Sequence, residues 1–244
     1  MSQLKKIIIK SYFKVIKPGS PVFIMGHMRS GSSLLEHILS SNSSIIGSGE
    51  QARIYESSYD FQKSEFFSRV NNKTFLSNFP YFTDQVLHNH LTPNLDFLKN
   101  TNGKYLFLIR DPHETLSSMK KLKKAYNGVS EYFDYISYYK DRIKYLINFS
   151  KKLESHQQIF ITYEDIVSNT DETLIKISEF LKLKKPLTPF YKLKKTTGVL
   201  GDRSENIRKQ LIQKTKKELV ELDNQTKEDL YESYNAAIAY FKKL

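Results

Sequence analysis

The sequence predicts an α/β fold: a single P-loop-like domain with a central parallel sheet flanked by helices and a helical C-terminal part. Apolar runs of strand length alternate along the chain with segments of helical periodicity, an order typical of a doubly wound parallel sheet. Residues 105–109, YLFLI, are apolar throughout, which suits a strand buried on both faces. Polar or glycine-rich motifs follow three of the strand-like runs, at the edge where such sheets bind ligands.

In the first half of the chain, apolar residues recur at helical spacing in four segments, 4–16, 32–41, 57–70 and 93–100. The expected strands are 21–26 and the short pair Ile45-Ile46. Lysines mark one side of the first helix, and Pro18-Gly19 breaks it. That helix fits a role at a membrane surface or, as the simpler interpretation, packing on the domain as a surface helix.

In the second half, the expected strands are 105–109 and 158–163. Helices are expected after Arg110-Asp111-Pro112, at 130–154, from Asn169 or Thr170 to Leu181, and over the tail 207–243. The sequence has no internal repeat and no low-complexity linker. We therefore expect one domain over residues 1–244.

The composition excludes several classes of protein. The chain has no cysteine, which excludes a disulfide framework, thiolate chemistry and cysteine-ligated metals. Its apolar runs are shorter than a membrane span, so stable membrane insertion is not expected. The N-terminal isoleucine run is too short and too interrupted by lysine for a secretory signal. A cytoplasmic protein is the default interpretation.

The formal net charge is +12, from 38 Lys+Arg against 26 Asp+Glu, and it favours anionic partners. Zinc-finger spacing, an RNA-recognition signature and a long basic helix are all missing from the sequence. Most lysines therefore fit a solvated surface. Nucleic-acid binding is a weaker alternative, which a steep salt dependence of affinity would reveal.

The stretch GHMRSGSS, residues 26–33, connects the first expected strand to the helix after it. Its two glycines permit a backbone that curls around an anion, and the helix directs its N-terminal amides and positive dipole end at the same point. The loop adds hydroxyl groups from Ser30, Ser32 and Ser33 and a permanent charge from Arg29. An NTPase loop carries lysine where Ser32 stands, so the sequence predicts a phosphate site without that lysine.

Further motifs lie at the same expected edge. Arg110 ends the apolar strand and Ser118 lies on the next helix, so the two can grip a phosphate dianion from two sides. The plainer alternative is an arginine paired with Asp111. Glu50, in GSGE, is a carboxylate that can act as general base toward an acceptor hydroxyl. The polar, basic segment 201–209 fits either a loop that closes over the anion or a charged surface turn.

Taken together, these motifs resemble the sulfotransferases that use 3'-phosphoadenosine 5'-phosphosulfate (PAPS). Residues 28–33, Met-Arg-Ser-Gly-Ser-Ser, resemble the family's donor loop, P-[RK]-S-G-T-[TS], with Gly31 at its glycine. Arg110 and Ser118 match the R-D-P element and the serine eight residues after its arginine, which grip the 3'-phosphate. The pattern R-S-G-[TS]-[TS]-L followed by G-E is most similar to tyrosylprotein sulfotransferases and related bacterial enzymes, in which the glutamate matching Glu50 is the proposed base.

The resemblance implies further donor ligands and a mechanism. Tyr163, in YED, would line the nucleotide site, and the segment 201–209 resembles the family's closing loop, with Ser204 and Arg208 as donor ligands. Arg29, the loop amides and Ser204 would stabilise the charge that develops on the leaving phosphate. PAPS is the implied donor, PAP the product, and no metal is implied.

Two positions depart from the family pattern. Met28 replaces the proline before the loop arginine, and Asp84-Gln85 stands where related enzymes carry Asp-Lys, whose lysine helps the departing sulfuryl group. His88 and His90 are the nearest substitutes, although a pair of structural histidines is the plainer interpretation. A P-loop kinase or NTPase, and a nucleotide-binding protein with weak or no catalysis, are therefore kept as alternatives to sulfuryl transfer.

The resemblance also organises the chain. It implies a nucleotide-binding core at 21–209, preceded by a helical extension at 1–20 and followed by C-terminal helices at 210–244. The acceptor would be a small molecule, carbohydrate or peptide, in a bacterial cytoplasm. Its pocket is expected from segments 51–80 and 120–150, whose tyrosines and phenylalanines suit a sugar, a phenol or a peptide tyrosine equally well.

Overall fold

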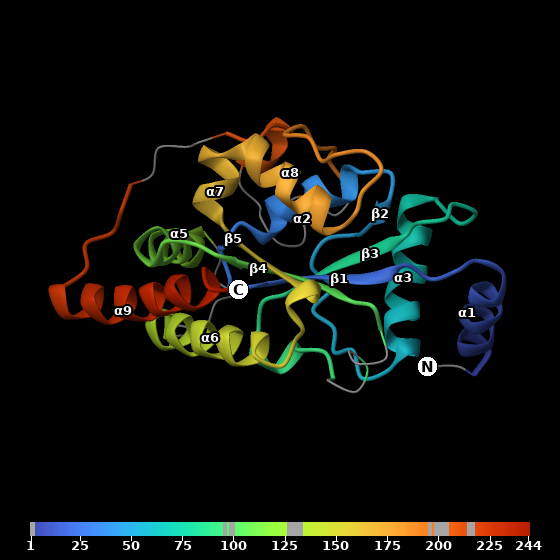
Figure 1. Cartoon of the computed structure of the whole chain (residues 1–244), viewed down its shortest axis with the longest axis horizontal. Coiled ribbons are helices and arrows are strands. Elements are labelled where there is room, and N and C mark those ends of the chain that lie inside the picture. Colours follow the sequence, from blue (N-terminus) through green and yellow to red (C-terminus); the bar gives the residue numbers. More distant parts are fainter. Residues whose placement is uncertain are drawn as a thin grey trace.

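A wholly parallel, five-stranded sheet with strand order β2-β3-β1-β4-β5 lies at the centre of the molecule (Figure 1). The computed structural model describes residues 3–94, 97, 101–125, 134–194, 197, 205–213 and 218–244. The strands are β1 (Ser20–Gly26), β2 (Ile45–Ile46), β3 (Tyr81–Val86), β4 (Lys104–Ile109) and β5 (Gln158–Thr162). The predicted α/β class with a central parallel sheet is confirmed.

Helices cover both faces of the sheet (Figure 1). One face packs against α2 (Ser32–Ser41), α7 (Tyr163–Ser168) and α8 (Thr170–Phe180). The other face packs against α3 (Ser58–Asn72), α6 (Tyr135–Ser150) and α9 (Asn224–Phe241). Helix α5 (Pro112–Ala125) contacts α6 and α9, and α1 (Gln3–Val15) lies on the outer side of α3. The 3₁₀ turns are η1 (Asn89–Leu91), η2 (Ser155–Gln157) and η3 (Glu205–Lys209).

The two-sided burial explains the apolar runs. Successive side chains of a strand point to opposite faces, so Val22 and Ile24 of β1 pack toward α2, while Phe23 and Met25 pack toward α6. All four are fully buried, and β4 behaves in the same way. A strand covered on both faces therefore reads as a continuous apolar run.

Strand β3 was not among the predicted strands, although it pairs with both β1 and β2. Its centre is Thr83-Asp84-Gln85, and polar residues conceal a strand pattern. All three are nonetheless buried, because β3 lies inside the sheet. This polar centre contributes to the site described below.

Several expected helix boundaries were wrong. In the expected tail helix 207–243, the described residues 210–213 and 218–223 take no helical form, and the α-helix begins at Asn224, beyond the 3₁₀ turn η3. Helix α6 ends at Ser150, and most of the expected helix 93–100 lies outside the described residues. Tyr163 starts α7 instead of ending β5, since the side chain of Thr162 accepts a hydrogen bond from the Asp165 amide and caps the helix.

The order and direction of the strands determine which edge of the sheet can bind a ligand. From the central β1 the chain passes to β2 and β3 on one side and then to β4 and β5 on the other. All strands run parallel, so their carboxyl ends meet at the same edge, where ligands bind in sheets of this type. Among the described residues, no helix is long and apolar enough to cross a membrane.

Candidate functional site

The loop between β1 and α2 has the shape of an anion cradle. The Ser30 amide donates a 3.1 Å hydrogen bond to the His27 carbonyl, and Arg29 adopts a left-handed φ of 65°. No side chain caps α2 at Gly31, an arrangement that suits an anion at the helix N-terminus. The Ser30 hydroxyl is fully buried and has no hydrogen-bond partner in the described structure. A ligand oxygen at the loop would satisfy it.

Gly31 is required at its position for two reasons. Its φ of 94° is in the left-handed region, which glycine adopts without strain. A Cβ added there would lie 2.4 Å from Cδ2 of Tyr163, so the tyrosine ring packs directly on the glycine. Tyr163 therefore lies at the loop, as expected for a residue that lines a nucleotide site.

Four residues that are predicted to bind the sulfuryl donor form one cluster. Nε of Arg29 donates a 2.9 Å hydrogen bond to Oγ of Ser118, which reaches the loop from α5. Nη1 of Arg110 donates to the Arg29 carbonyl at 2.9 Å. The Arg110 guanidinium also lies 4.3 Å from the centre of the Tyr163 ring, within cation–π range. The structure thus brings together residues from the β1 loop, the end of β4, α5 and α7.

The ionic partner of Arg110 is Glu114, and the alternative of a pair with Asp111 was wrong. Nη2 and Nε of Arg110 lie 3.0 and 3.2 Å from Oε2 of Glu114, one helical turn away. Asp111 instead accepts from the Glu114 amide, which caps α5, and from the hydroxyl of Tyr231. A phosphate bound at Arg110 would therefore share the guanidinium with a carboxylate.

One face of α6 supports three strand ends, which the sequence analysis missed. The Tyr138 hydroxyl accepts from the Met28 amide at 2.9 Å and donates to the Leu87 carbonyl at 2.7 Å. The Tyr139 hydroxyl donates to the Arg110 carbonyl at 3.0 Å. Both tyrosines lie within segment 120–150, from which acceptor contacts are expected, and their hydroxyl groups hold the phosphate loop and the end of β4.

Arg142, one turn further along α6, is almost fully buried and donates to oxygen atoms of two strands and a turn. Its side chain bonds the Gly26 carbonyl at 2.8 Å, the Val86 carbonyl, and Oδ1 of Asn89 at 2.8 Å. Burial lowers the pKa of Arg142 to about 10, so it stays protonated at neutral pH. Helical spacing of Tyr138, Tyr139 and Arg142 was the available signal.

His27 joins the loop to β4. Its Nε2 accepts the Arg110 amide hydrogen at 3.2 Å, which assigns the proton to Nδ1 and makes Nδ1 the donor to the Met28 carbonyl at 2.9 Å. The ring is fully buried, and this burial lowers the pKa of His27 to about 3. A neutral imidazole thus fixes the start of the Arg110 segment.

Glu50, the predicted base, lies near both the phosphate loop and β3. Its side chain is half-buried, and burial raises the pKa of the Glu50 carboxyl. Burial also raises the pKa of Tyr138 to about 12, and the charge of Glu50 adds to that shift. Glu50 follows β2 in the chain, and the amide of its neighbour Gln51 bonds Asp84 of β3.

Two buried carboxylates hold the backbone on either side of Glu50. Oε1 of Glu36, on α2, accepts from the Gly49 amide at 3.2 Å. Oδ1 of Asp84, on β3, accepts from the Gln51 amide at 3.2 Å. Both side chains are at most 1% exposed. We call this arrangement the carboxylate clamp.

Each carboxylate of the clamp has its own partner. Glu36 pairs with Lys194, whose Nζ also donates to the Gly47 carbonyl at 3.0 Å. Asp84 accepts from the Tyr55 hydroxyl, and burial, with a smaller contribution from the charge of Glu50, raises the pKa of Asp84 to about 7. The clamp therefore connects α2, β3 and the segment that precedes residues 195–204.

The position of the missing lysine is buried and neutral. Gln85 is 3% exposed, and its Oε1 has no hydrogen-bond partner in the described structure. The His88 ring stacks on the His90 ring, with centres 5.5 Å apart, and lies tilted by 55° against the Tyr138 ring at 5.6 Å. Burial, with the nearby charges of His90 and Arg142, lowers the pKa of His88, which favours the neutral imidazole.

The structure describes only residues 205–209 of the predicted closing segment, 201–209. Ser204 lies outside the described residues. Arg208 is exposed on η3, next to Ile207, which is buried against the α2 and α8 side of the sheet. Within the described ranges, no three histidine, aspartate or glutamate residues gather as a metal site would require.

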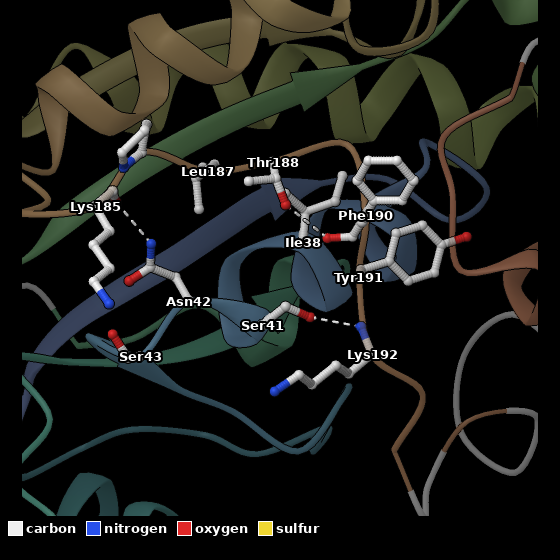
Figure 2. Close-up of a pocket in the computed structure, with 11 residues that line it drawn as sticks. Ile38, Ser41, Asn42, Ser43, Lys185, Leu187, Thr188, Phe190, Tyr191 and Lys192 are labelled. Atoms are coloured by element: carbon white, nitrogen blue, oxygen red, sulfur yellow. Dashed lines mark hydrogen bonds between the residues drawn. The ribbon is translucent and has the colours of Figure 1, made fainter.

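A pocket of about 410 Å³ lies at the other end of α2, away from the phosphate loop (Figure 2). Asn42 there donates to the Lys185 carbonyl at 2.9 Å, and the Lys192 amide donates to Oγ of Ser41 at 2.8 Å. These polar groups are occupied by the protein itself. The pocket includes none of the predicted donor residues, so it is separate from the candidate site.

Comparison with known proteins identifies the class. A model described as the sulfotransferase family matches residues 21–90 and 77–187, which together exceed half of the chain. The protein therefore belongs to the sulfotransferase family, and the resemblance inferred from its motifs is confirmed at this level. No curated protein matches the sequence.

Two solved structures agree on the fold, and a third is a weaker match. The sulfotransferase domain from the curacin biosynthetic pathway is 18% identical, with a TM-score of 0.60 over 89% of this chain and 98% of that one. A sulfotransferase from Alicyclobacillus acidocaldarius is 12% identical, with a TM-score of 0.50 over 93% of this chain and 96% of that one. Mouse sulfotransferase SULT7A1, complexed with PAP, is 14% identical, with a TM-score of 0.48 over 76% and 65% of the two chains.

Proposed function

We propose that the protein transfers a sulfuryl group from PAPS to a hydroxyl or amine of an acceptor. The observation that carries the proposal is the cluster of Arg29, Arg110, Ser118 and Tyr163 around the N-terminus of α2. The loop alone is enough to bind a single phosphate. The second pair of anion-binding groups, Arg110 and Ser118, favours a donor with two separate phosphate positions.

In this proposal each part of the cluster has its own role. The amides at the start of α2 and the hydroxyls of Ser30, Ser32 and Ser33 hold the 5'-phosphosulfate. The buried Ser30 hydroxyl without a partner fits this role. Arg110 and Ser118 hold the 3'-phosphate, and Tyr163 covers the loop glycine. Ser204 and Arg208 are proposed donor ligands from the family resemblance.

Glu50 is proposed as the general base. It takes the proton of the acceptor hydroxyl while the acceptor oxygen bonds to sulfur, and the bond between sulfur and the bridging oxygen breaks. The electron pair leaves with the 5'-phosphate, where Arg29, the loop amides and Ser204 stabilise the charge. A carboxyl pKa raised by burial brings the base closer to working pH, which improves proton transfer.

Acceptor contacts are proposed from the segment that continues beyond Glu50. Arg53 is half-buried there, and Ile54 is half exposed beside it. Segment 120–150 stays a proposed second contributor, although the hydroxyl groups of Tyr138 and Tyr139 bond the strand ends. A small molecule, carbohydrate or peptide that carries a hydroxyl or amine is the proposed acceptor class.

The decisive experiment is a product assay. The protein is incubated with PAPS and a panel of sugars, phenols and tyrosine peptides, and mass spectrometry detects PAP together with an acceptor heavier by one sulfuryl group. The same panel with ATP and magnesium tests the kinase alternative. PAP formed only when an acceptor is present supports the proposal. Phosphorylated products, or PAP binding without any turnover, support the NTPase or the non-catalytic alternative.

A further inference from the structure

Helix α1 exposes an apolar stripe to solvent. Leu4, Ile7, Ile8 and Val15 are 65%, 55%, 49% and 85% exposed, and helical geometry places them on one side of the helix. The opposite side is the one that packs: Ile9 is 1% exposed, and the helix contacts α3 (Figure 1). The stripe is therefore not the face that holds α1 on the domain.

The apolar surface continues beyond the helix. Phe75 and Leu76, in the segment after α3, are 41% and 88% exposed. The Tyr12 hydroxyl donates to the Phe75 carbonyl, which places this segment beside α1. Two separate stretches of chain thus present large apolar side chains at one corner of the molecule. Such a gathering marks an interaction surface.

The charge around the stripe is of one sign. Lys5, Lys6, Lys10 and Lys14 are all exposed on α1, and the first acidic residue of the sequence is Glu36. A symmetric contact between two copies of α1 would bring four lysines against four lysines without a carboxylate on the helix to offset them. The surface therefore selects an apolar partner with negative charge.

We propose that α1, with Phe75 and Leu76, docks on the surface of a bilayer that contains anionic lipid. The apolar stripe would enter the boundary between headgroups and acyl chains, while the lysine stems extend their ammonium groups to the lipid phosphates.

Docking at α1 leaves the candidate site accessible. Helix α1 precedes the amino end of β1, and the phosphate loop follows its carboxyl end. The seven residues of β1 separate the two by roughly 20 Å at about 3.3 Å per residue. The docking surface and the sulfotransferase site are therefore testable independently of each other.

The test is sedimentation of the full chain with vesicles of phosphatidylcholine alone or mixed with phosphatidylglycerol. Wild-type protein should bind the anionic vesicles at least about ten-fold more tightly, because a lysine near an anionic surface contributes about five-fold. Lys10→Gln with Lys14→Gln should weaken that binding about ten- to thirty-fold. Lys242→Gln with Lys243→Gln, at the end of α9, is the matched control and should change little.

The apolar stripe is tested in the same assay. Ile7→Ser with Ile8→Ser should weaken binding to anionic vesicles at least about ten-fold, since each side chain loses several buried CH₂ equivalents. Ile175→Ser removes an equally exposed isoleucine from α8 and should not affect binding. Thermal melts and PAP affinity should be the same for all these variants, because neither the core nor the site is changed.

Three outcomes would overturn the proposal. The first is equal binding, or none, to the two vesicle types. The second is unchanged vesicle binding by the Ile7→Ser, Ile8→Ser variant. The third is a wild-type protein that self-associates without lipid and becomes monomeric in that variant, which would make the stripe an interface between copies of the chain.

Discussion

The donor side of the site and the Glu50 side are built in different ways. Around the phosphate loop, the contacts join residues that carry recognisable motifs: Arg29 bonds Ser118, and Arg110 bonds the Arg29 carbonyl. Around Glu50, the contacts come from Glu36, which belongs to no motif, and from Asp84, which was noted only for the glutamine that follows it. The carboxylate clamp of Glu36 and Asp84 binds the amides of its neighbours Gly49 and Gln51.

This difference follows from what each side must do. A phosphate ligand demands amides, hydroxyls and guanidinium groups at a strand end, so its binding groups recur as a readable pattern. A general base must only be held at one place in one protonation state, and many combinations of buried groups can do that. Donor binding is therefore the easier function to read from sequence, and the placement of the base the harder one.

The largest expected effect is on turnover alone, and it distinguishes the Glu50 side of the site from the donor side. Glu50→Gln should lower turnover by roughly 10²–10⁴-fold, because it removes the proton acceptor, and should leave PAP affinity nearly unchanged. Glu56→Gln changes an exposed glutamate six positions further along and serves as the control. Turnover within a few-fold of wild type would exclude Glu50 as the base.

The next effect concerns the second phosphate. Wild-type protein should bind PAP about 10²-fold more tightly than AMP, since a charge-assisted arginine–phosphate contact is worth about 1.5–3 kcal/mol. Arg110→Ala should abolish most of this preference and barely change AMP affinity. Calorimetry of both ligands on both proteins measures it. Similar binding of AMP, ATP and PAP by wild type would favour the kinase-like alternative.

Substitution of Glu114 should change PAP affinity in the opposite direction. Its carboxylate shares the Arg110 guanidinium at 3.0 Å, so Glu114→Gln should strengthen PAP binding by a few-fold without altering AMP binding. A weaker affinity for PAP in this variant would mean that Glu114 mainly holds Arg110 in place. The two substitutions together distinguish charge from orientation.

A smaller effect than that of Arg110→Ala, and one on turnover alone, is expected from the clamp. Asp84→Asn keeps the size of the side chain but weakens its hold on the Gln51 amide, so kcat should fall about ten-fold or more through misplacement of Glu50. PAP affinity should stay unchanged, because Asp84 does not touch the donor cluster. Equal losses in kcat and PAP affinity would show instead that the whole edge of the sheet had moved.

The last expected effect is on stability instead of activity. The pKa of Asp84 is raised in the folded state to about 7, so the folded protein binds a proton that the unfolded chain releases near pH 4. Between these values wild-type stability should fall as pH rises, by up to about 1.4 kcal/mol per pH unit, and Asp84→Asn should flatten that slope. Denaturant titrations at several pH values measure it. An identical slope in both proteins would assign the titration to another group.

The fold was predictable because burial on both faces leaves a plain signal in β1 and β4. Strand β3 was not predicted because its centre, Thr83-Asp84-Gln85, is polar. Asp84 in that centre is a member of the carboxylate clamp. Local pattern fails where a strand carries polar groups that serve a site.

For the site, motifs located Arg29, Arg110, Ser118 and Tyr163, which the structure brings together. They did not locate His27, Arg142 or Glu36, since each acts through contacts with residues distant in the sequence. The hydrogen bond from Arg142 to Gly26 spans 116 positions, and no local pattern encodes such a contact. The roles of Glu50, Ser204 and Arg208 stay predictions.

The hydrogen bonds between α6 and residues far away in the sequence also affect the order in which the chain folds. Tyr138 and Arg142 bond Met28 and Gly26 across 110 and 116 positions, and closing so long a loop is an entropically slow event. Helices can form locally first, while the phosphate loop gains its support from Tyr138 and Arg142 only when α6 packs on the sheet. During refolding, helical circular dichroism should therefore recover before the capacity to bind PAP. A nascent chain still on the ribosome would lack a working nucleotide pocket until it had been made well past residue 142.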